Sequence, residues 1–332
     1  MAVDPSSKAQ ALRALCLRPF PQDVMVAANA LLEKHTIGDN MKQIPVRITA
    51  LFATAIAAVS LSTQAACLSD EQVAAMVKSM ADATPAASIE GLSDADGACT
   101  RQKLHQHMLT RHGAVIGYKA GLTNAAVQKR FNTDKPVWGR LYQGMLVTSG
   151  TTLPAKFAAR PLLESDLLVR VRSDRIMQAR TPMEVLDAID QIIPFIELPD
   201  LVVEAPQKLN GAGVAAINVG ARMGVTGTAL PVPTAAAERQ QLLDHLRDMK
   251  VTVSDGSATP LNVTPGTAIL EHPLNAVVWL VQALAAEDIQ LKAGELISLG
   301  SFSPLMPPKP GQQITVTYDG LPGAQAVVVN FR

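Results

Sequence analysis

The sequence is poor in aromatic residues and has no excess of charge of either sign. Phe, Trp and Tyr make up 4% of its 332 residues, and 29 basic residues are balanced by 29 acidic ones. A nucleic-acid-binding surface needs clustered Lys and Arg, commonly with aromatic side chains on which bases stack. The composition therefore argues against a nucleic-acid partner. The sequence also lacks a block of Lys and Arg that would indicate a membrane-surface patch.

An apolar run of membrane-spanning length is lacking near the N-terminus, although a shorter uncharged run covers 48–61. Basic residues precede this run, and the small-residue stretch STQAA follows it. The order basic, apolar, small is typical of a secretory signal peptide, and a buried helix is the alternative. The pattern predicts a signal peptide over 41–66, cleaved after Ala65 or Ala66. We expect export to the bacterial periplasm, with a cytoplasmic location as the alternative.

Residues 1–40 precede this signal, and we interpret them as an upstream extension from a start codon assigned too early. Of the three cysteines, Cys67 and Cys99 remain once 1–66 is removed. In an exported protein an even number of cysteines permits a disulfide. Two reduced thiols are the alternative, because sequence does not give the distance between them. A lipid anchor on Cys67 is disfavoured, since Gln64 stands where an apolar residue is usual.

The remaining chain changes from helical to strand periodicity. Helices are predicted over 68–83, which begins with a capping-box pattern, and over 96–113. We therefore expect a helical segment over 67–113 and the main domain over 114–332. Further helices are predicted from Pro182 up to a strand at 194–198, and over 272–288. Strand patterns occur in 114–123, 144–154, 160–171 and 213–224, and again in 294–320 and 324–331. Short helices on a mixed sheet make an α+β fold.

Two carboxylates share one side of the apolar strand RPLLESDLLVRV. Glu164 and Asp166 are two residues apart, so their side chains point the same way. Like charges in an apolar strand repel each other and resist desolvation. A third carboxylate, Glu197, lies at the end of the similar strand PFIEL. Three such groups suit a hard divalent cation such as Mg²⁺, which would neutralise them. A solvated strand face is the alternative.

The stretch GYKAGLTNAAVQKRFNTDKPVWGRLY, 117–142, resembles part of the 2-keto-4-pentenoate hydratase / 4-oxalocrotonate decarboxylase family, within the fumarylacetoacetate hydrolase superfamily. The family pattern G-Y-K-x-G-L-T, then a Gln, a Phe and a P-x-aromatic-G turn, is present. PLLESDLLVRV falls where the family has its E-x-E metal strand, and PFIELPD where it has the third acidic ligand. EHPLNAVVWLVQAL and GELISLGSFS also look like family segments. The resemblance runs in order from about Leu68 to the C-terminus.

The resemblance implies an α+β fold with a mixed β-sheet/β-roll core of the fumarylacetoacetate hydrolase type, short flanking helices and an N-terminal helical segment. It implies Mg²⁺ or Mn²⁺ on Glu164, Asp166 and Glu197, and a homo-oligomer by analogy. The implied activity is that of a hydro-lyase adding water to a small 2-hydroxy-dienoate or 2-oxo-enoate through a metal-bound enolate. A 2-oxo acid decarboxylase, an acylpyruvate C–C hydrolase and an exported binding protein without turnover are the alternatives.

The resemblance also suggests roles for other residues. Lys119 is the expected catalytic group, which would bind the substrate carboxylate or relay a proton. Leu122, Ser301 and Asn210 are expected to line the substrate site, with a turn serine as the alternative for Ser301. His272, at the start of a predicted helix, is interpreted as structural.

Two departures from the family pattern bear on activity. Asp166 stands where the family has Glu, and its side chain is one methylene shorter, so a cation must shift or take a water. The loop 198–213 lacks the family's acidic–Ser–Arg run and has Leu209 and Asn210 in place of an Asp-Asn pair. These departures leave the substrate range open and are the basis for the alternative of a binding protein.

Overall fold

The computed structural model of the chain describes residues 67–332. The extension 1–40 and the signal peptide 41–66 lie outside these residues, so both stay predictions. All described residues fall in one structural unit. Within it, the boundary expected between 113 and 114 is a change from helix to strand. The division into a helical segment and a main domain also stays a prediction.

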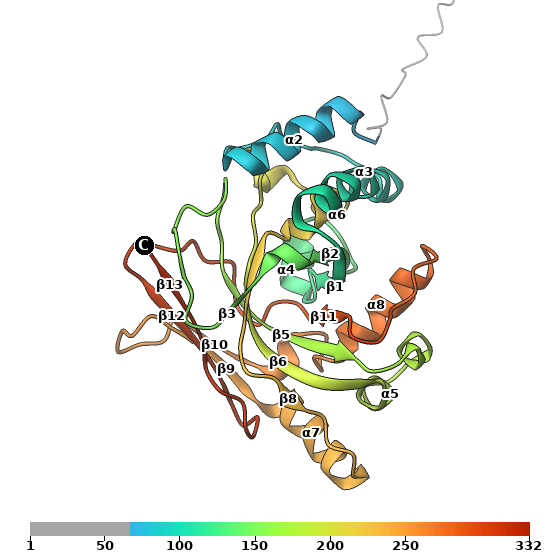
Figure 1. Cartoon of the computed structure of the whole chain (residues 1–332), viewed down its shortest axis with the longest axis vertical. Coiled ribbons are helices and arrows are strands. Elements are labelled where there is room, and N and C mark those ends of the chain that lie inside the picture. The colour runs from blue at the N-terminus through green and yellow to red at the C-terminus, as the bar shows by residue number, and fades with distance from the viewer. Residues whose placement is uncertain (1–66) are drawn as a thin grey trace, which may run out of the picture. The chain divides into compact units, whose positions relative to one another are not determined.

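Two helices at the start of the described chain confirm the sequence expectation (Figure 1). Helix α2 spans Asp70–Asp82 and α3 spans Asp94–His112, and each begins with a reciprocal capping box. Helix α3 ends at Gly113, whose φ of 80° favours glycine. Both helices pack with α6 (Gly211–Ala216) in one apolar cluster that includes Met76, Met108 and Val214.

A large mixed sheet forms the centre of the described residues, with strand order β2-β1-β11-β5-β6-β7-β3 (Figure 1). Its strands are β1 (Val115–Gly121), β2 (Val137–Tyr142), β3 (Leu146–Thr148), β5 (Glu164–Val171), β6 (Ile189–Leu198), β7 (Met223–Thr226) and β11 (Leu296–Ser298), with β8 (Leu230–Pro231) paired to β6. The pairs β1–β11 and β3–β7 are parallel, whereas β5 pairs antiparallel with β6 and with β11.

A second sheet has the order β10-β9-β12-β13-β4. Its strands are β4 (Thr152–Leu153), β9 (Lys250–Ser254), β10 (Asn262–Pro265), β12 (Gln313–Asp319) and β13 (Val327–Phe331). Buried residues alternate with more exposed ones along β12, so one face of this sheet packs inward. Its buried side joins Leu167 and Ile196 of the large sheet in one apolar core.

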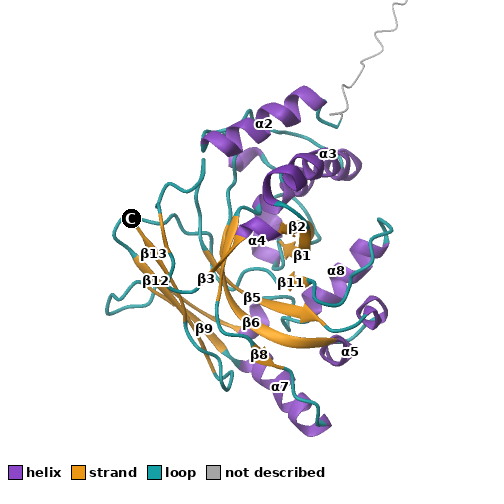
Figure 2. Cartoon of the chain, viewed as in Figure 1, coloured by secondary structure: helices purple, strands orange, loops and turns teal. Residues whose placement is uncertain are grey.

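Short helices flank the two sheets (Figure 2). They are α4 (Ala125–Arg130), α5 (Pro182–Ala188), α6 (Gly211–Ala216), α7 (Ala236–Asp248) and α8 (Asn275–Ala285), with 3₁₀ turns at Gln143–Met145, Asp174–Gln178, Pro206–Lys208, Asn218–Gly220 and Gly266–Ala268. Helix α8 lies within the predicted segment 272–288. In the part of the chain that the structure describes, every helix is too short or too polar to cross a membrane.

The strand predicted over 213–224 is wrong. Residues Gly211–Ala216 form helix α6, a 3₁₀ turn follows, and strand β7 begins only at Met223. The Asn210 side chain accepts a hydrogen bond from the Gly213 amide at 2.8 Å, which caps the helix. This cap and the small residues behind it outweigh the apolar pattern that suggested a strand.

The helix predicted from Pro182 ends earlier than expected. Helix α5 stops at Ala188, and β6 runs from Ile189 to Leu198. The β-branched residues of this stretch pair along the whole of β5. This strand pairing outweighs the helix-like spacing of apolar residues after Pro182 on which the prediction rested. The long strand matters for the site, because it carries Glu197 to a position opposite Glu164.

Candidate functional site

The register of β5 and β6 brings the three predicted acidic residues onto one face. Glu164 lies directly opposite Glu197, and Asp166 lies opposite Phe195. Residues opposite each other in an antiparallel pair share a face, as do residues two apart on one strand. Glu197 is 2% exposed and Asp166 is fully buried, so this face is an interior one.

Burial of these carboxyl groups makes their charged forms costly. Burial first, and then the nearby Glu197, raises the pKa of Glu164 well above its ordinary 4.5. The same two causes, in the same order, raise the pKa of Asp166 well above 3.8. The three groups therefore cannot all ionise cheaply without more positive charge close by.

Lys119 supplies part of that positive charge. It lies on β1 and is 2% exposed, and its ammonium forms an ion pair with Glu197. Its Nζ also donates to the Val219 carbonyl at 3.0 Å. One ammonium beside three carboxylates leaves two negative charges if all three ionise, which is the charge that one divalent cation balances.

Asp166 is held by three protein donors. Its carboxylate accepts hydrogen bonds from the Ser298 hydroxyl, from the Leu167 amide at 2.6 Å and from the Leu299 amide at 3.2 Å. These donors explain how an Asp is tolerated in a fully buried position. They also turn its side chain toward β11. Both amides donate to Oδ1, so Oδ2, which accepts from Ser298, is the oxygen that keeps a further lone pair.

A tyrosine from the second sheet contacts β5 and β6 next to the acidic residues. The Tyr318 hydroxyl, on β12, accepts from the Phe195 amide at 3.0 Å and donates to the Asp166 carbonyl at 2.5 Å. Asp166 and Phe195 face each other in the register. The hydroxyl therefore bridges β5 and β6 beside the acidic residues, which ties the two sheets together at this point.

A cavity of about 130 Å³ opens beside this face. Lys119 and Glu164 line it together with Arg130, Ser301 and Ser303. The apolar residues that line it include Leu122, Val127, Phe131, Leu201, Val214 and Leu305. The mixture of apolar walls and a few polar groups is typical of a small-molecule site.

The loop after β1 has an unusual backbone. Leu122 has a φ of 56°, in the left-handed region that a leucine rarely adopts. The Gln128 side chain donates to the Leu122 carbonyl at 2.8 Å and so stabilises this conformation. Such strain is common at binding sites, and here it places Leu122 in the cavity wall.

The structure separates the predicted substrate residues. Leu122 and Ser301 line the cavity. The Ser301 hydroxyl also donates to the Ser303 carbonyl at 2.6 Å and accepts from the Ser303 amide, so it is a turn serine as well. Asn210 does not belong to the cavity wall: it caps α6 and donates to the Leu92 carbonyl at 2.8 Å. Its backbone partners occupy the polar atoms that a substrate would need.

Sequence reasoning missed several residues of the site. Arg130 lies one helical turn after Val127, and both line the cavity. The spacing of three residues could have indicated that the two side chains share one face of the helix. Ser298 and Tyr318 come from segments far along the chain, and no local pattern links them to Asp166. His272 is structural, as expected, because its ring nitrogens contact the Leu243 carbonyl and the Leu274 amide.

The acidic residues fit a hard divalent cation in their chemistry, although they are not drawn together. Among residues 67–332, no group of three or more His, Cys, Asp or Glu side chains is placed to hold a metal ion as it stands. Glu197 turns to Lys119 and Asp166 to Ser298. Yet one Glu197 oxygen, Oε2, is buried without a hydrogen-bond partner in the described residues. Such an oxygen beside two further carboxylates matches the ligand preference of Mg²⁺.

No known protein-family model matches the chain. Individual relatives do match it. The 2-keto-4-pentenoate hydratase 1 of Dechloromonas aromatica is 26% identical over 270 residues, which cover 80% of this chain and 99% of that relative. A 2-keto-4-pentenoate hydratase of Paraburkholderia xenovorans is 28% identical and covers 62% and 73%. A 4-oxalocrotonate decarboxylase of Pseudomonas putida is 25% identical and covers 70% and 84%. These relatives are enzymes, and the resemblance inferred from the motifs is confirmed.

A solved structure shows the fold. The 4-oxalocrotonate decarboxylase from Pseudomonas putida G7, complexed with magnesium and adipate, matches with a TM-score of 0.67 and 23% identity, covering 81% of this chain and all of that one. Another structure of that enzyme, complexed with calcium and acetate, gives a TM-score of 0.66. The chain therefore shares the fold of that decarboxylase, and the expected α+β class with a mixed sheet is confirmed.

Proposed function

We propose that this chain is a divalent-metal-dependent hydro-lyase that adds water to a small 2-hydroxy-dienoate or 2-oxo-enoate. One observation supports this most directly. Glu164, Asp166 and Glu197 share a buried face of β5 and β6, beside a cavity that Glu164 and Lys119 both line. Relatives named 2-keto-4-pentenoate hydratase, matched over most of their length, point to the same chemistry.

The three carboxylates are the residues that would hold Mg²⁺ or Mn²⁺. When bound there, the cation would act as a Lewis acid for negative charge on the substrate's 2-oxygen. The orphaned Oε2 of Glu197 would gain a partner, and the like charges of Glu164 and Asp166 would be neutralised. Ser298 would keep Asp166 oriented through its hydroxyl.

Lys119 is the residue of this chain best placed to act on the substrate. Its Nζ has three N–H donors, of which the Glu197 carboxylate and the Val219 carbonyl take two. The third is available to a substrate carboxylate or for proton transfer in the cavity. The apolar walls around it exclude water from the reacting carbons and strengthen the ionic contact.

The cavity limits the size of the substrate. A cavity of roughly 150 Å³ accommodates a benzene-sized molecule. At about 130 Å³, this one suits an acid of five or six carbons. Ser301 and Ser303 both line its wall; the Ser301 hydroxyl donates to the Ser303 carbonyl, whereas the Ser303 hydroxyl accepts from the Ser165 amide and keeps its proton for a ligand.

The direct test is turnover of 2-hydroxypenta-2,4-dienoate with Mg²⁺. We expect loss of the dienol's ultraviolet absorbance, abolished by EDTA and restored by Mg²⁺. Glu164→Gln should lower the rate by at least about 10²-fold. Arg170→Ala is a matched control, because Arg170 is on the same strand but pairs with Asp190 outside the site. A folded protein that binds Mg²⁺ and leaves the dienol and other 2-oxo acids unchanged would instead be a binding protein.

A decarboxylase is the second candidate, and Arg130 is the observation that favours it. Arg130 lines the cavity that Lys119 also lines, so two cationic side chains could hold an acid with a carboxylate at each end. Release of CO₂ from an oxalocrotonate-type diacid, lost in Arg130→Gln, would support this reaction over hydration. Release of pyruvate from an acylpyruvate would indicate the C–C hydrolase instead.

A further inference from the structure

We propose that the chain is cleaved between Ala66 and Cys67, and that the new α-amino group of Cys67 is held by the Asp96 carboxylate while its thiol is locked in a disulfide with Cys99. This inference concerns maturation and compartment, and it does not depend on the proposed reaction. Its site is the start of α3, on the described residues 67–103.

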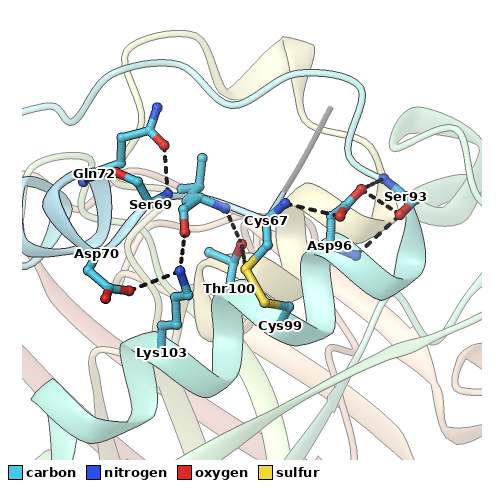
Figure 3. The surroundings of a disulfide bond; sticks show 10 residues. Cys67, Ser69, Asp70, Gln72, Ser93, Asp96, Cys99, Thr100 and Lys103 are labelled. Atoms are coloured by element: carbon cyan, nitrogen blue, oxygen red, sulfur yellow. Dashed lines mark hydrogen bonds and ion pairs between the residues drawn. A yellow bond between two sulfur atoms is a disulfide. The ribbon is translucent and has the colours of Figure 1, made fainter. Parts of the chain in front are cut away.

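Cys67 is fixed at this site through both its backbone and its side chain (Figure 3). Its backbone nitrogen donates to Asp96 Oδ1 at 3.0 Å, and its sulfur is bonded to that of Cys99, 32 residues along the chain. The Leu68 amide donates to Thr100 Oγ1 at 3.1 Å, and Lys103 Nζ donates to the Leu68 carbonyl at 2.9 Å. Successive groups from Cys67 onward therefore have partners on one helix.

The Asp96 carboxylate is suited to an ammonium group. At present an amide N–H donates to it, and its other oxygen accepts from the Ser93 hydroxyl at 2.6 Å. Cleavage would replace that amide by an ammonium, so the contact would become a charge-assisted hydrogen bond. A positive charge near a helix N-terminus is unfavourable by itself, and the carboxylate in the first turn of α3 offsets it.

The disulfide also decides between two kinds of exported protein. A lipoprotein carries its lipid on the sulfur of the first cysteine, through a thioether bond. The Cys67 sulfur is already bonded to Cys99, so it has no valence left for a lipid. The structure thus favours a released protein over a membrane-anchored one.

Both chemical steps balance with ordinary partners. Hydrolysis of the Ala66–Cys67 peptide bond by a signal-peptidase-type enzyme consumes one water and leaves a carboxylate on Ala66 and an amine on Cys67. The two thiols then lose two protons and two electrons to the disulfide of an exported thiol oxidase. Disulfides form and persist in exported compartments such as the bacterial periplasm, which agrees with the signal-peptide pattern of 41–66.

The test counts thiols, with Cys16 as an internal marker. The chain is produced in a bacterium both in full and from Met41, where the signal-peptide pattern begins, and each periplasmic fraction is denatured and alkylated before and after reduction. We expect a mature mass that begins at Cys67, no alkylated thiol before reduction, and two after it. Retention of the upstream segment would leave Cys16 alkylated without reduction. That result, or an N-terminus at another residue, would overturn the proposal.

A lipid-bearing protein would give a different pattern. Cys99 would then be alkylated before reduction, and Cys67 would carry an added lipid mass, which also overturns the proposal. Absence of the protein from the periplasm, with Cys67 and Cys99 both reduced in the cytoplasm, would do the same.

The role of Asp96 is tested by comparing two forms of the protein. Asp96→Asn should lower Tm in the processed protein by about 2–4 °C more than in the unprocessed chain, because only the processed form has the ammonium. Asp94→Asn is the matched control, since Asp94 is in the same helical turn but pairs with Lys135. Equal losses in both forms would refute the ammonium contact.

A second measurement does not depend on a variant. Labelling of the Cys67 α-amine as a function of pH should give an amine pKa above the usual value of about 8, because the carboxylate favours the charged form. An ordinary amine pKa would contradict the contact even if Asp96→Asn failed to fold.

Discussion

The two ends of the β5–β6 ladder differ in how their charged side chains are arranged. At one end, Glu164 lies opposite Glu197; Glu197 and Asp166 are buried, and Glu164 is half-buried at the cavity wall. At the other end, Arg170 meets Asp190 through two hydrogen bonds of 2.8 Å, and the two side chains are 38% and 34% exposed. One end buries like charges, and the other pairs opposite charges in contact with solvent.

The difference separates a structural pair from a functional site. An exposed ion pair contributes little to stability and costs little to keep. Buried like charges oppose folding, so their retention needs another reason. A ligand of opposite charge at the buried end supplies that reason, whereas the Arg170–Asp190 end needs none.

The largest effect is expected from Lys119→Met. The substitution removes the ammonium that pairs with Glu197 and leaves a buried carboxylate uncompensated. We expect a loss of at least about 10²-fold in kcat/KM and a loss of about 3–5 kcal/mol in the free energy of unfolding without metal. Urea unfolding and dienol turnover measure the two. Lys135→Met, at an exposed lysine that pairs with Asp94, is the control. Equal effects of both variants would show that burial of the Lys119–Glu197 pair is not the cause of the loss.

Ser298→Ala should weaken the buried end without removing a carboxylate. The hydroxyl that orients Asp166 is lost, and groups that orient a metal ligand are typically worth 10–100-fold in affinity. We expect a Mg²⁺ dissociation constant raised by about that factor, measured by titration calorimetry. Ser257→Ala, at an exposed turn, should leave it unchanged. Unaltered binding by Ser298→Ala would mean that Asp166 does not hold the metal.

The two ends should respond to pH with opposite signs in metal-free protein. Because the pKa of Glu164 is raised from 4.5 by burial, its stabilising contribution is complete below that pH and is lost as pH rises through the raised pKa. Hydrogen bonds from Arg170 lower the pKa of Asp190 below 3.8, so its contribution is present above that pH and is lost in acid.

The measurement is Tm against pH in EDTA. Glu164→Gln should flatten the decline in Tm above pH 4.5, and Mg²⁺ should offset the same decline in the unaltered protein. Asp190→Asn should reduce only the loss below pH 3.8. Part of the decline should persist in Glu164→Gln, because burial also raises the pKa of Asp166. A decline of unchanged size would show that Glu164 does not contribute to it.

The smallest effect is expected from Arg170→Ala. The pair with Asp190 is exposed, so we expect Tm to fall by no more than about 3 °C, with unchanged turnover. A large loss of activity would show that the two ends of the ladder are coupled.

The parts of the site that follow local rules were predictable from sequence. The period of a strand places Glu164 and Asp166 on one side, and the motif around Lys119 marks the cavity wall. Glu197 was identified by its position in a similar strand, but its place opposite Glu164 depends on where β6 begins, and the apolar stripe after Pro182 concealed that start.

Contacts between distant segments were not predictable. Ser298 reaches Asp166 because β11 lies beside β5, a pairing across more than a hundred residues that leaves no local pattern. Asn210 was assigned to the substrate site by its place in the altered loop, whereas an Asn before a run of small residues is also a helix cap. The capping role is the one that the structure shows.

Tyr318 has a consequence for how this protein can be altered. Its hydroxyl links the backbones of Asp166 and Phe195, although β12 contributes no carboxylate to the acidic face. The spacing of β5 and β6 at that face thus depends on a side chain near the C-terminus. Truncation before Gln313, or grafting of a foreign C-terminal sheet, would change the dimensions of the acidic face while leaving every acidic residue in place.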